Sequence, residues 1–464
     1  MLTLLAPQPE SLWDESLPVE VKELPEDLAA LDVLLADPKL LWPLVERWQR
    51  EFQESGRLVL TEGRPTIALE SYVRLMVLKA RYRWGYRTLM AEVSDSIHLR
   101  RFCRISLSER VPDESTVRKL TRRIGAETVS EMTRALIAGA TREKRFRPRA
   151  VRIDSTVIEA DVKYPTDAGL ASSGVRVLAR EGRKLAKLVK DKKARVRDRS
   201  RAMGHKLRTI TRTIRRRSGE AKQEVLKLTG ETGELLARSI KEARRLAAIA
   251  RRRARGRGAK AKLKEATALE KMADRCEKVA RQIKRRVAGE PIKDRIVSLH
   301  DPDARPIRKG KLGKRTEFGF VSQLAEVTEN TKRGARGLIL PASTELGNPA
   351  EETLLPGTVA ELARLGITIR EVAVDGGFKP GPTNTALADL HPKTVFIAGR
   401  QEPESKRTTR RLRRYRTGEE GRISHLKRRY GLDRSRLKGD PGRQIWTEWA
   451  ILAYNTDTLA VRQR

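Results

Sequence analysis

The chain of 464 residues is 39% hydrophobic, which is enough to bury the cores of two or three domains and excludes a disordered polyelectrolyte. It carries 99 Lys and Arg against 60 Asp and Glu, a net charge of +39. Such a surplus favours a polyanionic partner, above all a phosphate backbone. No apolar run approaches the roughly 20 residues that a membrane-spanning helix needs.

Residues 1–20 form an acidic, proline-containing tail without the basic and then apolar pattern of a signal peptide, so a cytoplasmic protein is expected. The two cysteines, Cys103 and Cys276, lie far apart and belong to no CxxC pair. They are therefore predicted to be reduced and packed as small apolar residues, and no zinc site is expected.

Residues 21–145 are predicted to be an all-α domain. Apolar residues recur at helical spacing over 67–78, a second helix fits 87–94, and Asp113 suits the N-cap of a third that runs to Ile124. Four basic residues on the polar face of this third helix are predicted to bind DNA in a helix-turn-helix-like manner: Arg118, Lys119, Arg122 and Arg123. The alternative is a small helical bundle with a solvated basic face.

The period of the sequence changes at residues 149–159, where Val151 and Ile153 alternate with Arg152 and Asp154 and predict a β-strand. From residue 294 the pattern is again α/β. Strands are predicted at 295–299, 317–327, 337–340, 368–374 and 394–398, and helices at 358–365, 418–430 and 443–461. Together these segments predict one α/β domain, split into residues 146–174 and 291–464.

Between the two parts, residues 175–290 hold 39 basic and 13 acidic residues, about two thirds of the net charge. Apolar residues step by three and four, as from Met203 to Ile214 and from Leu269 to Ile283, which predicts coiled-coil seams. Glycines at 230–233 and 256–258 predict breaks between helices. We interpret this region as a basic helical insertion whose exposed face contacts phosphate; a merely solvated face is the alternative.

Three acidic residues stand where packing does not require them. Asp154 lies within the first strand, Asp375 ends the strand 369–374 before two glycines, and Glu420 starts a basic helix on a face shared with Ser424 and Lys427. Carboxylates are hard oxygen ligands suited to Mg²⁺, and two such ions can activate water and stabilise a leaving 3′ oxygen in phosphodiester chemistry.

Ordinary explanations exist for each acid: Asp375 could be a turn residue and Glu420 a partner of the helix dipole. Glu159, Asp161 and Asp167 are the alternatives to Asp154 if the register is misjudged. The spacing of the three acids alone leaves the metal site and these explanations about equally favoured.

The same segments resemble the DDE transposases of bacterial insertion sequences, in particular the ISNCY-like group. The segment 154–159 is similar to the first-aspartate strand, 164–167 to a short motif after it, and 374–378 to the second-aspartate motif, with Gly376 in place of a basic residue. Arg416, Glu420 and Lys427 fit the glutamate signature Tyr-x2-Arg-x3-Glu-x6-Lys, with Arg413 at the tyrosine position.

This resemblance implies an RNase H-like catalytic domain in which Asp154, Asp375 and Glu420 hold two Mg²⁺ ions, or Mn²⁺ in their place. Arg416 and Lys427 would hold phosphates near the scissile bond. The implied partners are double-stranded transposon ends and target DNA, bound by at least a homodimer. The rival interpretations are an RNase H-like nuclease without strand transfer and a non-catalytic architectural DNA-binding protein.

Overall fold

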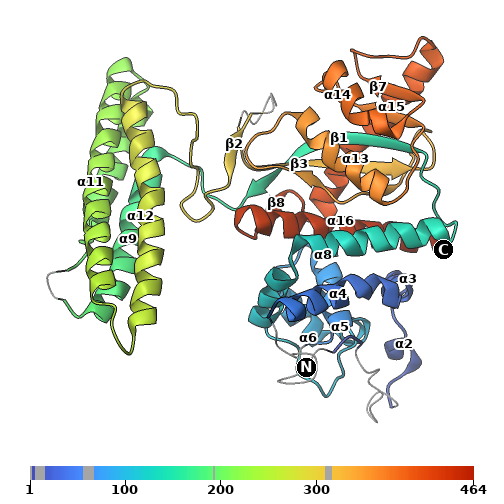
Figure 1. Ribbon diagram of the computed structural model, residues 1–464, viewed down its shortest axis with the longest axis horizontal. Coiled ribbons are helices and arrows are strands. Elements are labelled where there is room, and N and C mark those ends of the chain that lie inside the picture. Colours follow the sequence, from blue (N-terminus) through green and yellow to red (C-terminus); the bar gives the residue numbers. More distant parts are fainter. Residues whose placement is uncertain (1–2, 6–15, 56–66, 192–193, 309–315, 464) are drawn as a thin grey trace. The chain divides into compact units, whose positions relative to one another are not determined.

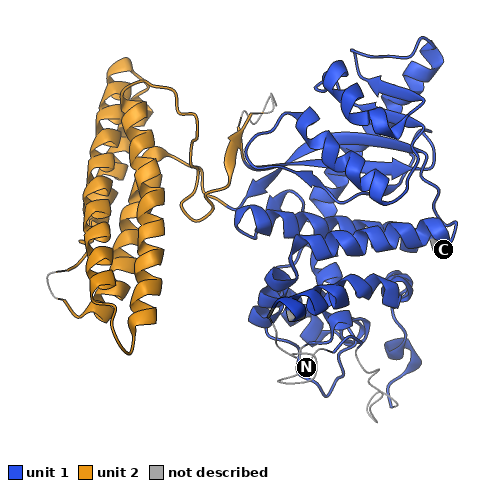
Figure 2. Ribbon diagram, in the orientation of Figure 1, with its two compact units in different colours: residues 1–161, 319–464 blue, residues 162–318 orange. Residues whose placement is uncertain are grey.

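The computed structural model describes residues 3–5, 16–55, 67–191, 194–308 and 316–463. The chain divides into two compact units (Figure 2). Unit 1 comprises residues 1–161 and 319–464, and unit 2 comprises Val162–Phe318. The helical unit therefore takes in residues 162–174 and 291–318, which the sequence patterns assigned to the α/β part.

In the N-terminal part of unit 1, the regular elements among the described residues between 19 and 142 are all helices. Asp113 caps the longest of these helices, because its Oδ1 accepts a hydrogen bond from the Ser115 amide at 2.7 Å. Gly125, with φ 79°, interrupts this helix directly after Ile124. The helices are α2 (Val19–Lys22), α3 (Glu26–Leu35), α4 (Pro38–Ser55), α5 (Leu69–Arg81), α6 (Tyr86–Asp95), α7 (Ile97–Phe102) and α8 (Glu114–Arg142).

The second part of unit 1 is built on a mixed sheet with β1 (Ala150–Ala160) at its centre (Figure 1). On one side β1 pairs antiparallel with β3 (Glu317–Thr328), and on the other side it pairs parallel with β6 (Glu371–Val374). A parallel β7 (Thr394–Ile397) follows β6. Short strands extend this sheet: β4 (Leu338–Ile339) and β5 (Ser343–Thr344) beside β3, and β8 (Arg434–Ser435) beside β1.

Helices follow these strands in unit 1: η2 (Glu351–Leu354), α13 (Leu355–Arg364), α14 (Pro380–Leu387), η3 (Ala388–Leu390), α15 (Lys406–Arg429) and α16 (Gly439–Gln463). The helix predicted at 418–430 is thus the second half of a longer one. Four predicted strands correspond to observed ones with small shifts of their ends: 317–327, 337–340, 368–374 and 394–398.

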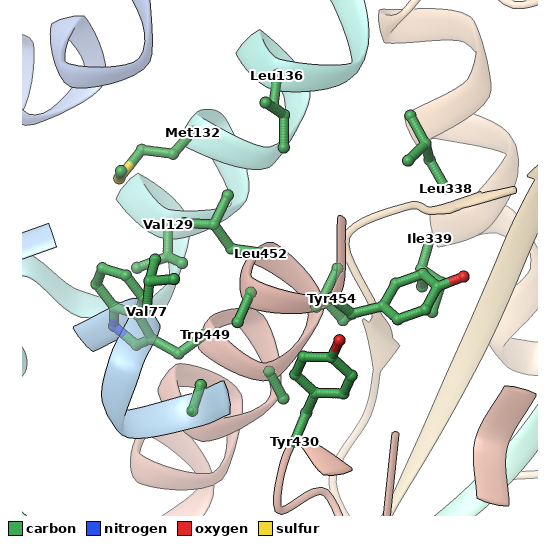
Figure 3. Close-up of a cluster of buried hydrophobic side chains, with 14 of the residues drawn as sticks. Val77, Val129, Met132, Leu136, Leu338, Ile339, Tyr430, Trp449, Leu452 and Tyr454 are labelled. Carbon is green, nitrogen blue, oxygen red and sulfur yellow. The ribbon is translucent and has the colours of Figure 1, made fainter. Parts of the chain in front are cut away.

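Helix α16 joins the helical part of unit 1 to its sheet. Trp449 and Leu452 pack against Val77 of α5 and Val129 of α8, while Tyr454 lies beside Ile339 of β4 (Figure 3). The amide of Asn455 exchanges two hydrogen bonds of 2.8 Å with the backbone of Ile339, as a neighbouring strand would. One hydrophobic core therefore runs from the N-terminal helices to the sheet.

Unit 2 contains the long helices α9 (Asp167–Val189), α11 (Gly219–Arg252) and α12 (Ala259–Val287), which lie side by side (Figure 1). Helix α10 (Ser200–Thr213), η1 (Ile214–Arg216) and the short strand β2 (Arg305–Ile307) complete it. Gly174 permits close packing, because a Cβ there would lie 2.8 Å from Leu236 Cδ1.

Three expectations for this region were wrong. Helix α11 continues through Gly230 and Gly233, because small residues at these positions face α12 instead of breaking the helix. Residues 295–299 form no strand, since this segment runs along the helices and buries Ile296 and Leu299 in their core. The first predicted seam does not extend to Ile214, because this residue is 60% exposed. In the second predicted seam, four of the apolar residues are buried in this core: Leu269, Cys276, Val279 and Ile283.

Candidate functional site

Asp154 and Asp375 lie together at the carboxyl end of β6. Strand β6 pairs with β1 so that Val374 stands opposite Ile153, and each aspartate is the next residue of its chain segment. Parallel strands therefore bring two acids that are far apart in sequence to one edge of the sheet. The two carboxylates are held by local amides, from Ser155 at 2.7 Å and from Gly377 at 2.8 Å.

Glu351 is the third acid of this site. Carboxylate oxygens of Asp154, Glu351 and Asp375 all lie within 4.8 Å of one another, and all three residues are half-buried. Gly377 permits this approach, because a Cβ there would stand 2.6 Å from Glu351 Oε2 and 2.9 Å from Asp375 Oδ1. Gly377 is therefore required by the close approach of carboxylates to the backbone, whereas a Cβ at Gly376 would stand 2.8 Å from the Ala398 carbonyl oxygen.

The position of Glu351 is fixed from the sheet. The buried side chain of Gln323 on β3 donates to the Glu351 carbonyl at 2.9 Å and accepts from the Thr358 hydroxyl of α13 at 2.9 Å. The sequence analysis missed Glu351 because it starts a one-turn helix and has no motif of its own. Pro349, two residues before Glu351, and the adjacent Glu352 indicate only a helix start.

Three clustered carboxylates in a half-buried place repel one another when charged, and a cation between them would offset this repulsion. Their hard oxygen atoms and their number suit Mg²⁺ or Mn²⁺ and do not suit soft metals. The residues present thus fit a divalent cation.

Glu420 is not a member of this acidic group. Its side chain on α15 is 57% exposed and accepts a hydrogen bond of 2.9 Å from Arg416 Nη2, one helical turn earlier. Lys427 on the same helix donates to the Val157 carbonyl of β1 at 2.9 Å. The signature residues Arg416, Glu420 and Lys427 thus lie along a helix that packs on the strand of Asp154, with Arg416 and Lys427 already engaged by protein groups.

The neighbour of Glu420, Glu419, points into the protein instead. It is 1% exposed and faces Arg152 Nε of β1 at 3.2 Å. Arg152 also pairs with Glu326 of β3, and Arg422 of α15 donates to the same Glu326 at 3.0 Å. Burial raises the pKa of the Glu419 carboxyl well above its usual range, and the nearby charges of Glu326 and Asp154 add to this effect. These four charged side chains fix α15 on the sheet.

The four basic residues predicted to bind DNA in the N-terminal part differ in their surroundings. Arg118 pairs with Glu114 at 2.8 Å, and Arg123 pairs with Glu51 at 3.0 Å and lies over the Trp48 ring. Lys119 and Arg122 are exposed and form no ion pair with a described residue. Two of the four predicted DNA-binding residues therefore pair with acidic side chains of the protein itself.

Comparison with known protein families gives a match in the N-terminal part of unit 1. Residues 37–123, from α4 to the first half of α8, match a family described as "Transposase domain (DUF772)". No curated protein and no solved structure matches the chain. This match supports a transposase role, and with it DNA as the partner. In the described part of the chain, no helix is long and apolar enough to cross a membrane.

Proposed function

We propose that the protein is an insertion-sequence transposase of the DDE type, which cleaves DNA at transposon ends and joins the resulting 3′ ends to target DNA. The observation that carries this proposal is the meeting of Asp154 and Asp375 at one edge of the sheet, with Glu351 within 4.8 Å. The transposase match lies in a different part of the chain and independently supports a transposase role in general.

The topology supports an RNase H-like identity for the sheet. The long central strand β1 pairs antiparallel with β3 and parallel with β6, and β7 lies parallel beside β6. The two aspartates lie in β1 and directly after the adjacent β6. Helix α15 packs on β1, where the resemblance places the helix of the glutamate. This arrangement is what the resemblance to DDE transposases implies.

Within this proposal Asp154 and Asp375 hold divalent ions, and Glu420 completes the set from α15. Glu351 is a further ligand or replaces Glu420. Two bound Mg²⁺ ions, or Mn²⁺, would activate the attacking oxygen and stabilise the leaving 3′ oxygen. Arg416 and Lys427 position the phosphate by charge, and Gln323 holds Glu351 in place through its backbone carbonyl.

Double-stranded DNA is the proposed substrate, as terminal repeats and as target. Joining two transposon ends requires two active sites, so we propose that a homodimer or larger assembly forms on DNA. We also propose a cytoplasmic protein that associates with the nucleoid when bound to DNA.

The test is cleavage and joining by the purified protein. The substrates are a plasmid with the DNA segments that flank the gene and a duplex with a pre-cut 3′-hydroxyl end, each with Mg²⁺. Asp154→Asn and Asp375→Asn should each lower cleavage and joining by about 10³-fold or more, because each removes an anionic ligand of the metal. Asp161→Asn is the matched control, since Asp161 is exposed one residue beyond β1 and outside the acidic group.

Cleavage without joining would support the nuclease instead. Equal nicking by the wild type and both aspartate variants would show that Asp154 and Asp375 are not the catalytic residues. The same assay on Glu351→Gln, Glu419→Gln and Glu420→Gln tests which of these glutamates supplies the third metal ligand. If α15 supplies the third ligand, Glu420→Gln loses activity to the level of Asp154→Asn and Glu351→Gln loses less. The reverse order would assign the role to Glu351.

A further inference from the structure

The first half of α15 borders a groove of about 380 Å³ that is distinct from the acidic site. Its lining is basic except for one threonine: Thr331, Arg333, Lys406, Arg407, Arg410, Arg411 and Arg414. The lining comes from two segments, the start of α15 and the turn after β3. The groove is therefore a built surface and not one helix face alone.

The basic residues of α15 fall into two classes. Some have a protein partner: Arg411 donates to Glu371 at 2.8 Å, Arg413 to Glu402 at 2.8 Å, and Arg422 to Glu326 at 3.0 Å. By contrast Arg407, Arg410 and Arg414 are exposed, and none of them forms an ion pair with a residue that the structure describes. Three of the basic residues that line the groove thus have no acidic partner among the described residues, and Arg411 beside them pairs with Glu371.

These cations do not stabilise the helix that carries them. The first turn of α15 contains no acidic residue, and Lys406 and Arg407 stand where the helix dipole disfavours positive charge. Arg407, Arg410 and Arg414 follow one another by three and four residues, so like charges are neighbours on one face. This arrangement of positive charges does not stabilise the fold, whereas an anionic ligand in the groove would offset the repulsion between them.

The groove has a defined position relative to the acidic site. Arg411 and the Thr331 hydroxyl both bind Glu371, the first residue of β6, and Asp375 follows the last residue of the same strand. Four residues of a strand span about 13 Å, which corresponds to about four base pairs of DNA rise.

We propose that Arg407, Arg410 and Arg414 bind the phosphodiester backbone of duplex DNA about four base pairs from the phosphate that is cleaved. This inference rests on the proposed function for the position of cleavage, but the binding itself does not require catalysis. The backbone could belong to the transposon end or to target DNA, and both present the same phosphate chemistry.

The first test is the salt dependence of DNA binding by the full-length protein carrying Arg407→Gln, Arg410→Gln and Arg414→Gln together. Each lost phosphate contact lowers the slope of log affinity against log salt by about 0.9, so the slope should fall by about 3. The charge-matched control carries Arg142→Gln, Arg429→Gln and Lys438→Gln, which are exposed residues outside the groove. An equal fall in both triple variants would overturn the proposal, because it would report net charge alone.

The second test places the contact. Single neutral methylphosphonate linkages are introduced along a flanking-DNA duplex and, separately, along a duplex of unrelated sequence. Linkages about four base pairs from the cut should weaken wild-type binding by several-fold and leave the groove variant unaffected. An effect in the flanking-DNA series assigns the groove to the transposon end, and one in the unrelated series assigns it to target DNA. No position-dependent difference between wild type and variant in either series would overturn the proposal.

These binding tests are separable from the proposed function. If Asp154→Asn loses cleavage while the groove variant keeps the salt slope of the wild type, the active site is supported and the groove proposal is refuted. A groove effect in a protein that never cleaves would refute the proposed function and retain the binding surface. Single-stranded RNA of matched length serves as the competitor, and preferential binding of the RNA would overturn the assignment to duplex DNA.

Discussion

The two units use charge in opposite ways. In unit 1, charged side chains are buried and paired, as Arg152, Glu326, Glu419 and Arg422 are between the sheet and α15. In unit 2 most ion pairs lie at the surface and the core is aliphatic, with the pair of Arg244 and Asp274 as an example. Buried pairs fix the geometry of a site, whereas a surplus of exposed cations creates a field that attracts a polyanion.

The largest expected effect is on the buried pairs of unit 1. Arg152→Met leaves the carboxylates of Glu326 and Glu419 without their shared cation, and we expect the free energy of unfolding to fall by about 3–5 kcal/mol. All six tryptophans belong to unit 1, so denaturation followed by tryptophan fluorescence reports this unit alone. Arg149→Met, an exposed neighbour, should change stability by less than about 0.5 kcal/mol. Equal stability of the two variants would contradict the structural role of the buried cluster.

The next effect concerns Lys79, which is buried over the rings of Trp446 and Tyr86 at 4.1 and 4.8 Å. Burial lowers the pKa of this amine to about 7, and the charge of Arg436 acts in the same direction. The unfolded chain binds the proton up to about pH 10, so the folded state is disfavoured below pH 7 and gains stability as the pH rises from 7 to about 10.

Replacement of this amine should therefore remove a pH dependence. Lys79→Met should stabilise unit 1 by about 2–4 kcal/mol at pH 7 and by progressively less toward pH 10. The measurement is the denaturation midpoint by tryptophan fluorescence at several pH values. A wild-type midpoint that does not change between pH 7 and 10 would contradict this account.

The smallest effect is expected from the exposed charge of unit 2. Arg252, Arg255 and Arg257 lie at the turn between α11 and α12, are exposed, and have no ion pair with a described residue. Replacing all three by Gln should weaken DNA binding about tenfold at moderate salt and leave cleavage at saturating DNA unchanged. An unchanged salt slope would mean that this end of the unit does not touch phosphate.

Much of the fold could be predicted because its signals are local. The alternation around Asp154 and the glycines after Asp375 correctly predicted two strands, and Asp113 correctly predicted a helix start. The break at Gly230 was wrong because a glycine in a helix can also serve close packing, which depends on a partner helix far away in sequence.

The site shows the same limit. Asp154 and Asp375 come together because β1 pairs with β6. Both acids could be found from the sequence, because the strands that carry them can be predicted without knowing which strands pair. Glu351 could not be found in this way, since it reaches the sheet edge through tertiary contacts such as that of Gln323 with its backbone. Glu420 was identified by the spacing of its motif, and spacing does not reveal that its carboxylate pairs with Arg416.

Direct measurement of metal binding tests the central claim, that the acidic group of Asp154, Glu351 and Asp375 is a divalent-cation site. Mn²⁺ is titrated into the full-length protein bound to flanking DNA, and bound ions are counted by electron paramagnetic resonance. We predict that Asp154→Asn and Asp375→Asn each weaken Mn²⁺ binding by at least about tenfold, whereas Asp161→Asn binds as wild type does. Unchanged Mn²⁺ affinity in both Asp154→Asn and Asp375→Asn would contradict the account.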